Sequence, residues 1–250
     1  MNNDNIQAYG TLCSLYYDAT EKFASHKEVD FFISWIGQHP GKVLEAMSGS
    51  GRLQLPLIQA GYDVEGVDHY SAMLERCHQR AKELEVQVQT YQQSLENLLL
   101  PHVYGTIIIA FGSIQLISDR EILVKVLKNL RSHMAHDGNL LLDIFIPDTT
   151  IEKSSVSTVK LDESTSICVK RRHIFDEQNK MVMTFSLFEL LVNGVIQKQE
   201  NELIEIVWRS DEEWKELLFE AGFEIVKIYD KKFKESEKSR IIHAKPVVKV

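Results

Sequence analysis

The stretch Val43–Arg52, VLEAMSGSGR, decides the fold class. Its apolar start, which runs into Glu45, indicates a short buried strand, and the Gly-x-Gly that begins at Gly49 indicates a tight turn into a helix. A strand, a glycine turn and a helix N-terminus leave several backbone N–H groups without partners, so the stretch predicts a loop that binds a nucleotide or a related cofactor. Met47 stands where a first loop glycine is expected.

The spacing of this loop argues against two phosphate-binding patterns. A P-loop needs Gly-Lys-Ser/Thr after four intervening residues, and none follows. The dinucleotide pattern Gly-x-Gly-x-x-Gly fails when read from Gly49, because Gln54 holds the third glycine position. The carboxylate of Glu45 would also repel a pyrophosphate. An NAD-dependent oxidoreductase is therefore the less favoured alternative.

A second carboxylate favours a nucleoside cofactor. Asp68 ends the next apolar stretch, VEGVD, which we interpret as the second strand. A carboxylate at that position accepts hydrogen bonds from ribose hydroxyls. Glu45 beside the loop suits a cofactor whose nearby end is cationic, since unlike charges attract.

Strands and helices alternate along the chain as far as Pro147. This alternation predicts an α/β fold with a doubly wound, mostly parallel seven-stranded sheet and helices on both faces. Residues 148–158 are polar and predict a loop. Three alternating runs then lie between residues 157 and 208, with Asn193-Gly194 as a hairpin turn, and predict an inserted antiparallel β meander.

The end of the chain returns to the core. Ser210 and Glu213 form a capping box before a helix, and two last strands would complete the sheet as a hairpin. We therefore expect four parts: an N-terminal helical lid segment at 1–40, a cofactor-binding α/β core at 41–150, the β insertion at 151–208, and the C-terminal helix and hairpin at 209–250.

Composition narrows the function classes. The 250 residues carry a formal net charge of −8, which argues against a general nucleic-acid binder. No apolar run approaches the roughly 20 residues that span a bilayer, and the polar N-terminus lacks a signal core. Cys13, Cys77 and Cys168 fit neither a metal site nor a disulfide framework. We expect a cytoplasmic monomer or homodimer without a metal, a membrane partner or a nucleic-acid partner.

Six segments together resemble class I S-adenosylmethionine-dependent methyltransferases. In order they are VLEAMSGSGR, VEGVDHYSAMLERC, YQQSLENL, IIIAFGSIQLI, HDGNLLLDIF and EEWKELLFEAGFEIV, and the resemblance covers roughly residues 15–245. The family's order and spacing of these segments carry the resemblance, because no single one of them is specific. The resemblance implies S-adenosyl-L-methionine as the cofactor and a small-molecule methyl acceptor as the partner.

The resemblance also implies residue roles at the cofactor. Glu45 would lie beside the methionine amino group, and Asp68 would bind the two ribose hydroxyls. Phe111 would border the sulfonium side. The loop positions at the cofactor would be Ala46, Met47, Ser48, Gly49 and Gly51. His69 and Met73 would lie beside the adenine, and Ser94 and Leu95 would lie at its edge.

The acceptor site is expected at the carboxyl ends of the strands, under the N-terminal segment and the insertion. Its candidate residues are Tyr16, Tyr17, Ser113, Phe145, Arg171 and His173. For Arg171 and its charged neighbours, a solvated strand edge is the competing interpretation. The sequence identifies no catalytic base, and the acceptor atom stays open between O, N, C and S.

Two departures from the family pattern leave an alternative open. Met47 replaces a glycine, which costs energy if that position needs a positive φ. Ser94 replaces the family's usual acid and can still form one hydrogen bond. The alternative is a catalytically impaired protein that binds the cofactor and keeps the methyltransferase fold.

Overall fold

The computed structural model describes residues 8–146, 153–231, 233 and 239–247. The chain divides into two compact units. Met1–Lys22 and Asp148–Val207 form the first unit, and Phe23–Pro147 and Trp208–Val250 form the second. We call them the β unit and the core unit.

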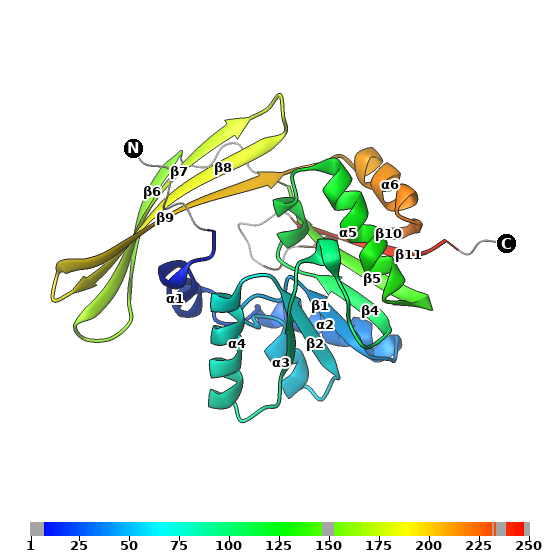
Figure 1. Cartoon of the computed structure of the whole chain (residues 1–250), viewed down its shortest axis with the longest axis horizontal. Coiled ribbons are helices and arrows are strands. Elements are labelled where there is room, and N and C mark those ends of the chain that lie inside the picture. The colour runs from blue at the N-terminus through cyan, green and yellow to red at the C-terminus, as the bar shows by residue number, and fades with distance from the viewer. Residues whose placement is uncertain (1–7, 147–152, 232, 234–238, 248–250) are drawn as a thin grey trace. The chain divides into compact units, whose positions relative to one another are not determined.

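A seven-stranded sheet in the order β10-β11-β5-β4-β1-β2-β3 forms the core unit (Figure 1). Its strands are β1 (Val43–Ala46), β2 (Val64–Asp68), β3 (Gln89–Gln92), β4 (Tyr104–Ile109), β5 (Met134–Phe145), β10 (Phe223–Lys231) and β11 (Ser239–Pro246). Strands β1 to β5 pair in parallel, and β11 is antiparallel to both β5 and β10. The predicted doubly wound, mostly parallel seven-stranded sheet is confirmed, and so is the final hairpin.

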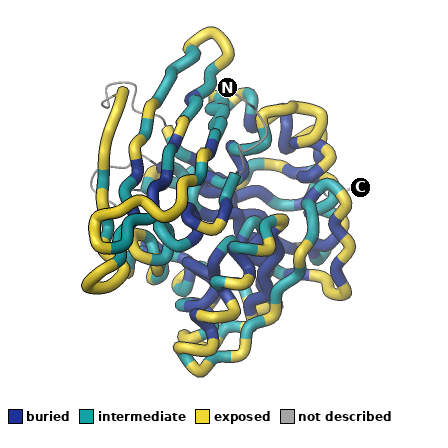
Figure 2. Tube along the Cα trace, turned by 60° about the vertical axis from the view of Figure 1, so that its left-hand side comes forward, coloured by how far each residue is buried: buried dark blue, intermediate teal, exposed yellow. Residues whose placement is uncertain are grey.

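Helices cover both faces of this sheet. They are α2 (His26–Gln38), α3 (Gln54–Gln59), α4 (Ser71–Glu83), α5 (Arg120–Ser132) and α6 (Asp211–Glu220), with the short 3₁₀ helices η1 (Leu95–Asn97) and η2 (Ser113–Leu116). Leu127 of α5 and Trp214 of α6 pack on one face, and Phe32 of α2 packs on the other. The central strands are therefore buried on both sides, as the dark tube in Figure 2 shows.

The helices begin where their sequences place caps. The side chain of Ser25 accepts a hydrogen bond from the backbone N–H of Glu28, and Ser210 with Glu213 forms the predicted capping box. Pro56 is the third residue of α3, so it lies in the first turn, where a missing N–H is tolerated.

A buried carboxylate joins the strands at the amino edge of the sheet. Glu65 of β2 accepts hydrogen bonds from the Tyr104 hydroxyl at 2.6 Å and from Lys42 Nζ at 2.9 Å, and its other partner is His102. These bonds oppose the effect of burial, and the pKa of Glu65 is lowered. The loops that follow β1, β2 and β4 lie at the opposite, carboxyl edge of the sheet.

A four-stranded antiparallel sheet forms the β unit, in the order β6 (Ser154–Lys160), β7 (Thr165–Asp176), β8 (Met181–Val192) and β9 (Val195–Val207). The predicted antiparallel meander is confirmed. The turn residues Asn193 and Gly194 have φ values of 51° and 77°, as their dipeptide predicts. The prediction of a loop at 148–158 is wrong from Ser154 onward, where β6 begins. Because β6 is an edge strand with mostly exposed residues, its sequence is as polar as that of a loop.

Helix α1 (Thr11–Thr20) is capped by a carboxylate from a strand of the β unit. Glu200 of β9 accepts hydrogen bonds from the backbone N–H of Leu12 at 3.1 Å and of Cys13 at 3.3 Å. The cap position, Gly10, offers no side chain of its own, and a Cβ there would clash with the Glu200 carboxylate. Negative charge at a helix N-terminus satisfies its free N–H groups, so Glu200 stabilises α1 on the sheet.

We predict that Glu200→Gln weakens the start of α1. The change removes a charged acceptor, and loss of a helix cap costs about 1 kcal/mol. Hydrogen exchange of the Leu12 and Cys13 amides, measured by NMR, should speed up about fivefold. Glu163→Gln, on the exposed turn before β7, is the matched control. Equal exchange rates in the two variants would contradict this role for Glu200.

Candidate functional site

The loop after β1 has an unusual backbone. Met47, Gly49 and Gly51 have φ values of 60°, 55° and 76°. The two glycines adopt this left-handed conformation without a steric cost, but for a methionine it costs roughly 1–2 kcal/mol. The Met47 side chain is partly buried and packs against the main hydrophobic core. The first loop position therefore requires a positive φ, and the methionine adopts it.

The carboxylate of Asp68 connects this loop to the end of β2. Its Oδ2 accepts a hydrogen bond from the backbone N–H of Gly49 at 2.8 Å, and its Oδ1 accepts one from Tyr70 at 2.9 Å. Burial raises the pKa of Asp68, and these backbone hydrogen bonds oppose the rise. The carboxylate is thus held in a fixed orientation beside the glycine turn.

Buried polar side chains hold the loop from below. Arg80 of α4 is almost fully buried, and its Nη1 donates to the carbonyl oxygen of Ser50 at 2.7 Å and to its hydroxyl at 2.8 Å. A Cβ at Gly51 would lie 2.7 Å from Cys77 Sγ, so only glycine allows α4 to pack this closely on the loop. Sequence reasoning missed Arg80, because the sequence does not distinguish a buried arginine on an amphipathic helix from an exposed one.

Glu45 is buried at the end of β1, with 4% of its surface exposed. Burial raises its pKa to about 8, against the opposing effect of the Arg52 charge. Its Oε2 has no hydrogen-bond partner among the residues that the structure describes. A buried carboxylate oxygen without a partner is costly, and an ammonium group would both satisfy it and stabilise its charged form. The site therefore fits a ligand with a cationic end.

The turn after β4 forms the next side of the site. Phe111 and Gly112 have φ values of 56° and 67°, and the backbone N–H of Phe111 donates to Asp143 Oδ2 at 3.0 Å. The Phe111 and Phe145 rings meet edge to face, 5.5 Å apart, and a Cβ at Gly112 would clash with Phe145. The hydroxyl of Ser113 donates to its own turn, at the carbonyl oxygen of Ala110.

The adenine candidates have different surroundings. Met73 is buried, and its Cε would lie 3.6 Å from a Cβ on Gly49, so it lies beside the loop. His69 follows Asp68 directly and is exposed. Ser94 caps η1 by accepting a hydrogen bond from the backbone N–H of Glu96, and Leu95 packs in the core. Ala46 and Ser48, the remaining loop candidates, are both buried.

The other acceptor candidates belong to the β unit. The Tyr16 hydroxyl accepts a hydrogen bond from Arg171 Nη1 at 3.4 Å, and the guanidinium lies 4.8 Å from the centre of the Tyr16 ring. His173 is hydrogen-bonded with the Thr184 hydroxyl, and burial lowers its pKa. Tyr17 is partly buried, and the loss of solvent around its hydroxyl raises its pKa. The structure thus brings Tyr16 and Arg171 into contact.

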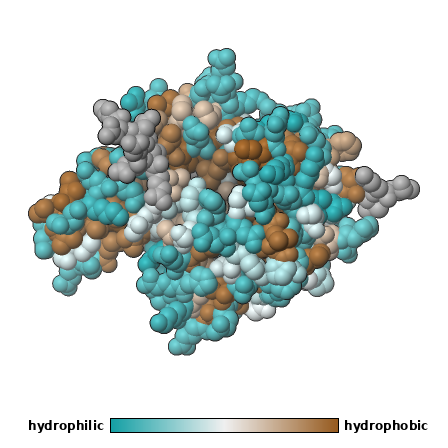
Figure 3. All heavy atoms as spheres, in the orientation of Figure 1, coloured by the Kyte–Doolittle hydropathy of each residue, from teal (hydrophilic) through white to brown (hydrophobic). Residues whose placement is uncertain are grey.

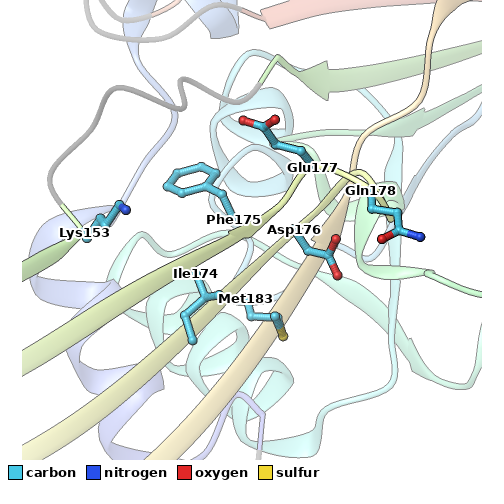
Figure 4. Close-up of a pocket in the computed structure, with 7 residues that line it drawn as sticks. All are labelled: Lys153, Ile174, Phe175, Asp176, Glu177, Gln178 and Met183. Carbon is cyan, nitrogen blue, oxygen red and sulfur yellow. The ribbon is translucent and has the colours of Figure 1, made fainter.

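A shallow pocket at the β7–β8 hairpin is separate from these candidates. Ile174 and Met183 pair directly across the two strands, and in Figure 4 their side chains lie on one side of the hairpin. None of the predicted site residues is among those that line the pocket, which are Lys153, Ile174, Phe175, Asp176, Glu177, Gln178 and Met183.

Two further findings concern the described part of the chain. It contains no group of three or more His, Cys, Asp or Glu side chains arranged to hold a metal ion. None of its helices combines the length and the apolar character needed to cross a bilayer.

Figure 3 shows a largely hydrophilic face with small brown apolar patches.

We predict that replacing Met47 with glycine gives a more stable protein than replacing it with alanine. Both variants lose the same side-chain contacts, but only alanine keeps the Cβ that makes a positive φ unfavourable. After the entropy cost of glycine, a difference of about 0.5–1 kcal/mol should remain in the free energy of unfolding. Urea denaturation measures it, and an alanine variant of equal or higher stability would contradict strain at this residue.

Comparison with known proteins shows similarity to methyltransferases. Residues 43–138 match the family model of a methyltransferase domain. A glycine/sarcosine N-methyltransferase of Aphanothece halophytica is 30% identical over 122 residues, which are 48% of this chain and 46% of that protein. The chain therefore spans a little under half the length of that relative.

Two solved structures share the fold over nearly their whole length. One is an S-adenosylmethionine-dependent methyltransferase from Clostridium acetobutylicum ATCC 824, with a TM-score of 0.77, 17% identity, and coverage of 94% of this chain and 98% of that one. The other is the sugar N-methyltransferase KedS8 from Streptoalloteichus sp ATCC 53650, with a TM-score of 0.76, 15% identity, and coverage of 97% and 96%. The chain therefore has the class I fold of these S-adenosylmethionine-dependent methyltransferases.

Proposed function

We propose that this protein is a methyltransferase that uses S-adenosyl-L-methionine and acts on a small-molecule acceptor. The observation that carries the proposal is the placement of two buried carboxylates, Glu45 and Asp68, on either side of the glycine turn at the carboxyl ends of β1 and β2. Glu45 has an oxygen without a partner among the described residues, and Asp68 is held by backbone N–H groups. This pair suits a ligand that is cationic at one end and carries hydroxyls further along.

Each part of the site would have one role in binding or catalysis. Glu45 would bind the amino group of the methionine moiety, and Asp68 would bind the ribose hydroxyls. Met73, packed beside Gly49, would flank the base. The bound cofactor supplies a methyl group on a sulfonium sulfur. Phe111, fixed by its backbone bond to Asp143 and by the ring of Phe145, would border the space that an acceptor enters and exclude water from it.

Positioning is the main contribution that such a site makes to the reaction. Holding two reactants in line at short distance is worth an effective concentration of roughly 10⁵ M or more. A general base is needed only where the acceptor arrives protonated. The rigid turns at Met47–Gly51 and at Phe111–Gly112 supply this positioning, because their backbones are held at positive φ by several hydrogen bonds and close contacts.

We further propose that the accepting atom is an amine nitrogen. The relative from Aphanothece halophytica is an N-methyltransferase of glycine and sarcosine, and KedS8 is a sugar N-methyltransferase. Both names support a small amine acceptor for this chain. The three cysteines are free thiols, which supports a reducing, cytoplasmic location. The protein would act as a monomer or a homodimer.

We predict that calorimetry detects binding of S-adenosylmethionine and of its demethylated product, and that Asp68→Ala weakens both at least tenfold. The alanine removes a charged acceptor for the ribose hydroxyls, which is worth about 1.5–3 kcal/mol. Asp137→Ala, at an exposed position of β5, is the matched control. A wild-type protein that fails to bind at millimolar concentration would refute the proposed function.

We also predict that the affinity for the demethylated product rises with pH from 6 to about 8. In the free protein the pKa of Glu45 is about 8, so below that pH the carboxyl is largely protonated and must lose its proton to bind an ammonium. The gain should approach tenfold per pH unit. Glu45→Gln should bind more weakly and lose this dependence, and an unchanged pH profile in that variant would exclude Glu45 as the group that titrates.

A further inference from the structure

We propose that Arg52 is a positioning residue of the cofactor site: it joins helix α2, the loop after β1 and the turn after β4, and its charge acts on the Glu45 carboxylate. The inference rests on the proposed function for what Glu45 binds. It adds a residue that neither the glycine pattern nor the family resemblance singles out. Arg52 and its partners Glu28 and Phe111 all belong to the core unit.

The first contact fixes the guanidinium on α2. Arg52 Nη1 donates to Glu28 Oε2 at 2.9 Å, and Nη2 donates to Glu28 Oε1 at 2.5 Å. Both side chains are buried, with 10% and 3% of their surfaces exposed. A parallel pair of charged hydrogen bonds fixes the orientation of the guanidinium as well as its distance. The segment just before α2 is also bound to the loop, because the backbone N–H of Ala24 donates to the carbonyl oxygen of Arg52 at 2.9 Å.

The second contact reaches the other loop of the site. The guanidinium carbon of Arg52 lies 4.2 Å from the centre of the Phe111 ring. A planar cation over an aromatic face is attracted by it, and the attraction is stronger where water is excluded. Phe111 lies in the turn after β4, and its backbone has a positive φ. Arg52 therefore holds a ring that borders the proposed methyl-transfer space.

The third link is electrostatic. The charged groups that act on Glu45 come from three elements: Arg52 from the loop, Glu28 from α2 and Asp68 from the end of β2. Arg52 favours the ionised form of Glu45, whereas the two carboxylates oppose it. Glu28 thus has two opposite effects: it holds Arg52 in place, and its own charge disfavours ionisation of Glu45.

This arrangement predicts different shifts for two variants. Glu28→Gln removes the opposing charge and keeps a hydrogen-bond acceptor for Arg52, so Glu45 should ionise at lower pH. The double variant Glu28→Gln, Arg52→Met removes both charges without leaving a buried ion unpaired. Compared with Glu28→Gln alone, the double variant lacks the Arg52 charge that favours ionisation. The double variant should therefore ionise Glu45 at higher pH than the single variant does.

The measurement is a ¹³C NMR titration of the Glu45 side-chain carboxyl in the ligand-free protein, assigned with Glu45→Gln. We expect the midpoint to move down in the single variant and to lie higher in the double variant than in the single one, while Arg52→Lys, which keeps the charge, stays near the wild type. The affinity for the demethylated product should follow the same order at pH 7. Because the titration needs no ligand, it tests Arg52 even if the protein fails to bind the cofactor.

Two results would overturn the inference. If both variants leave the Glu45 midpoint unchanged, or if the midpoint of the double variant is no higher than that of the single variant, Arg52 is only a structural link between α2 and the loop. If the midpoints move as expected but affinity at pH 7 does not follow them, the charge of Glu45 has no role in binding. A wild-type protein without affinity for the cofactor refutes the proposed function instead.

Discussion

The hydrogen bonds of the Asp68 carboxylate are the interaction on which the site depends. A parallel sheet places the ends of β1 and β2 side by side, but it does not fix the loops that follow them. Asp68 accepts the N–H of Gly49 from one loop and the N–H of Tyr70 from the other, and so fixes both. Its place beside the glycine turn follows from the pairing of β1 with β2, in which Ala46 lies opposite Val67.

The Met47 backbone becomes understandable from this constraint. A residue keeps an unfavourable backbone conformation only where several surrounding contacts fix that conformation. Here Asp68, Arg80 and the Glu28–Arg52 pair all hold the few residues that follow Met47. The methionine in place of a glycine therefore costs conformational energy at one residue only. The loop keeps the backbone conformation that the fold requires.

The sequence predicted the fold well, because alternating strands and helices and the turn signals are local. It predicted both glycines, Glu45 and Asp68 as one group for the same reason, since each ends a recognisable strand or begins a turn. It missed Glu28, Arg52 and Arg80 as supports of the loop, because their burial depends on which helix packs beside which strand. It also missed most of β6, because an exposed edge strand has the composition of a loop.

The most direct test of the account is a crystal structure of the protein with the demethylated product of the cofactor. The account predicts the amino group of the ligand at Glu45 Oε2, the ribose hydroxyls at Asp68, and the loop Met47–Gly51 unchanged in backbone. A ligand bound elsewhere, or one that contacts the loop while Glu45 Oε2 stays without a partner, would contradict the assignment of these two carboxylates.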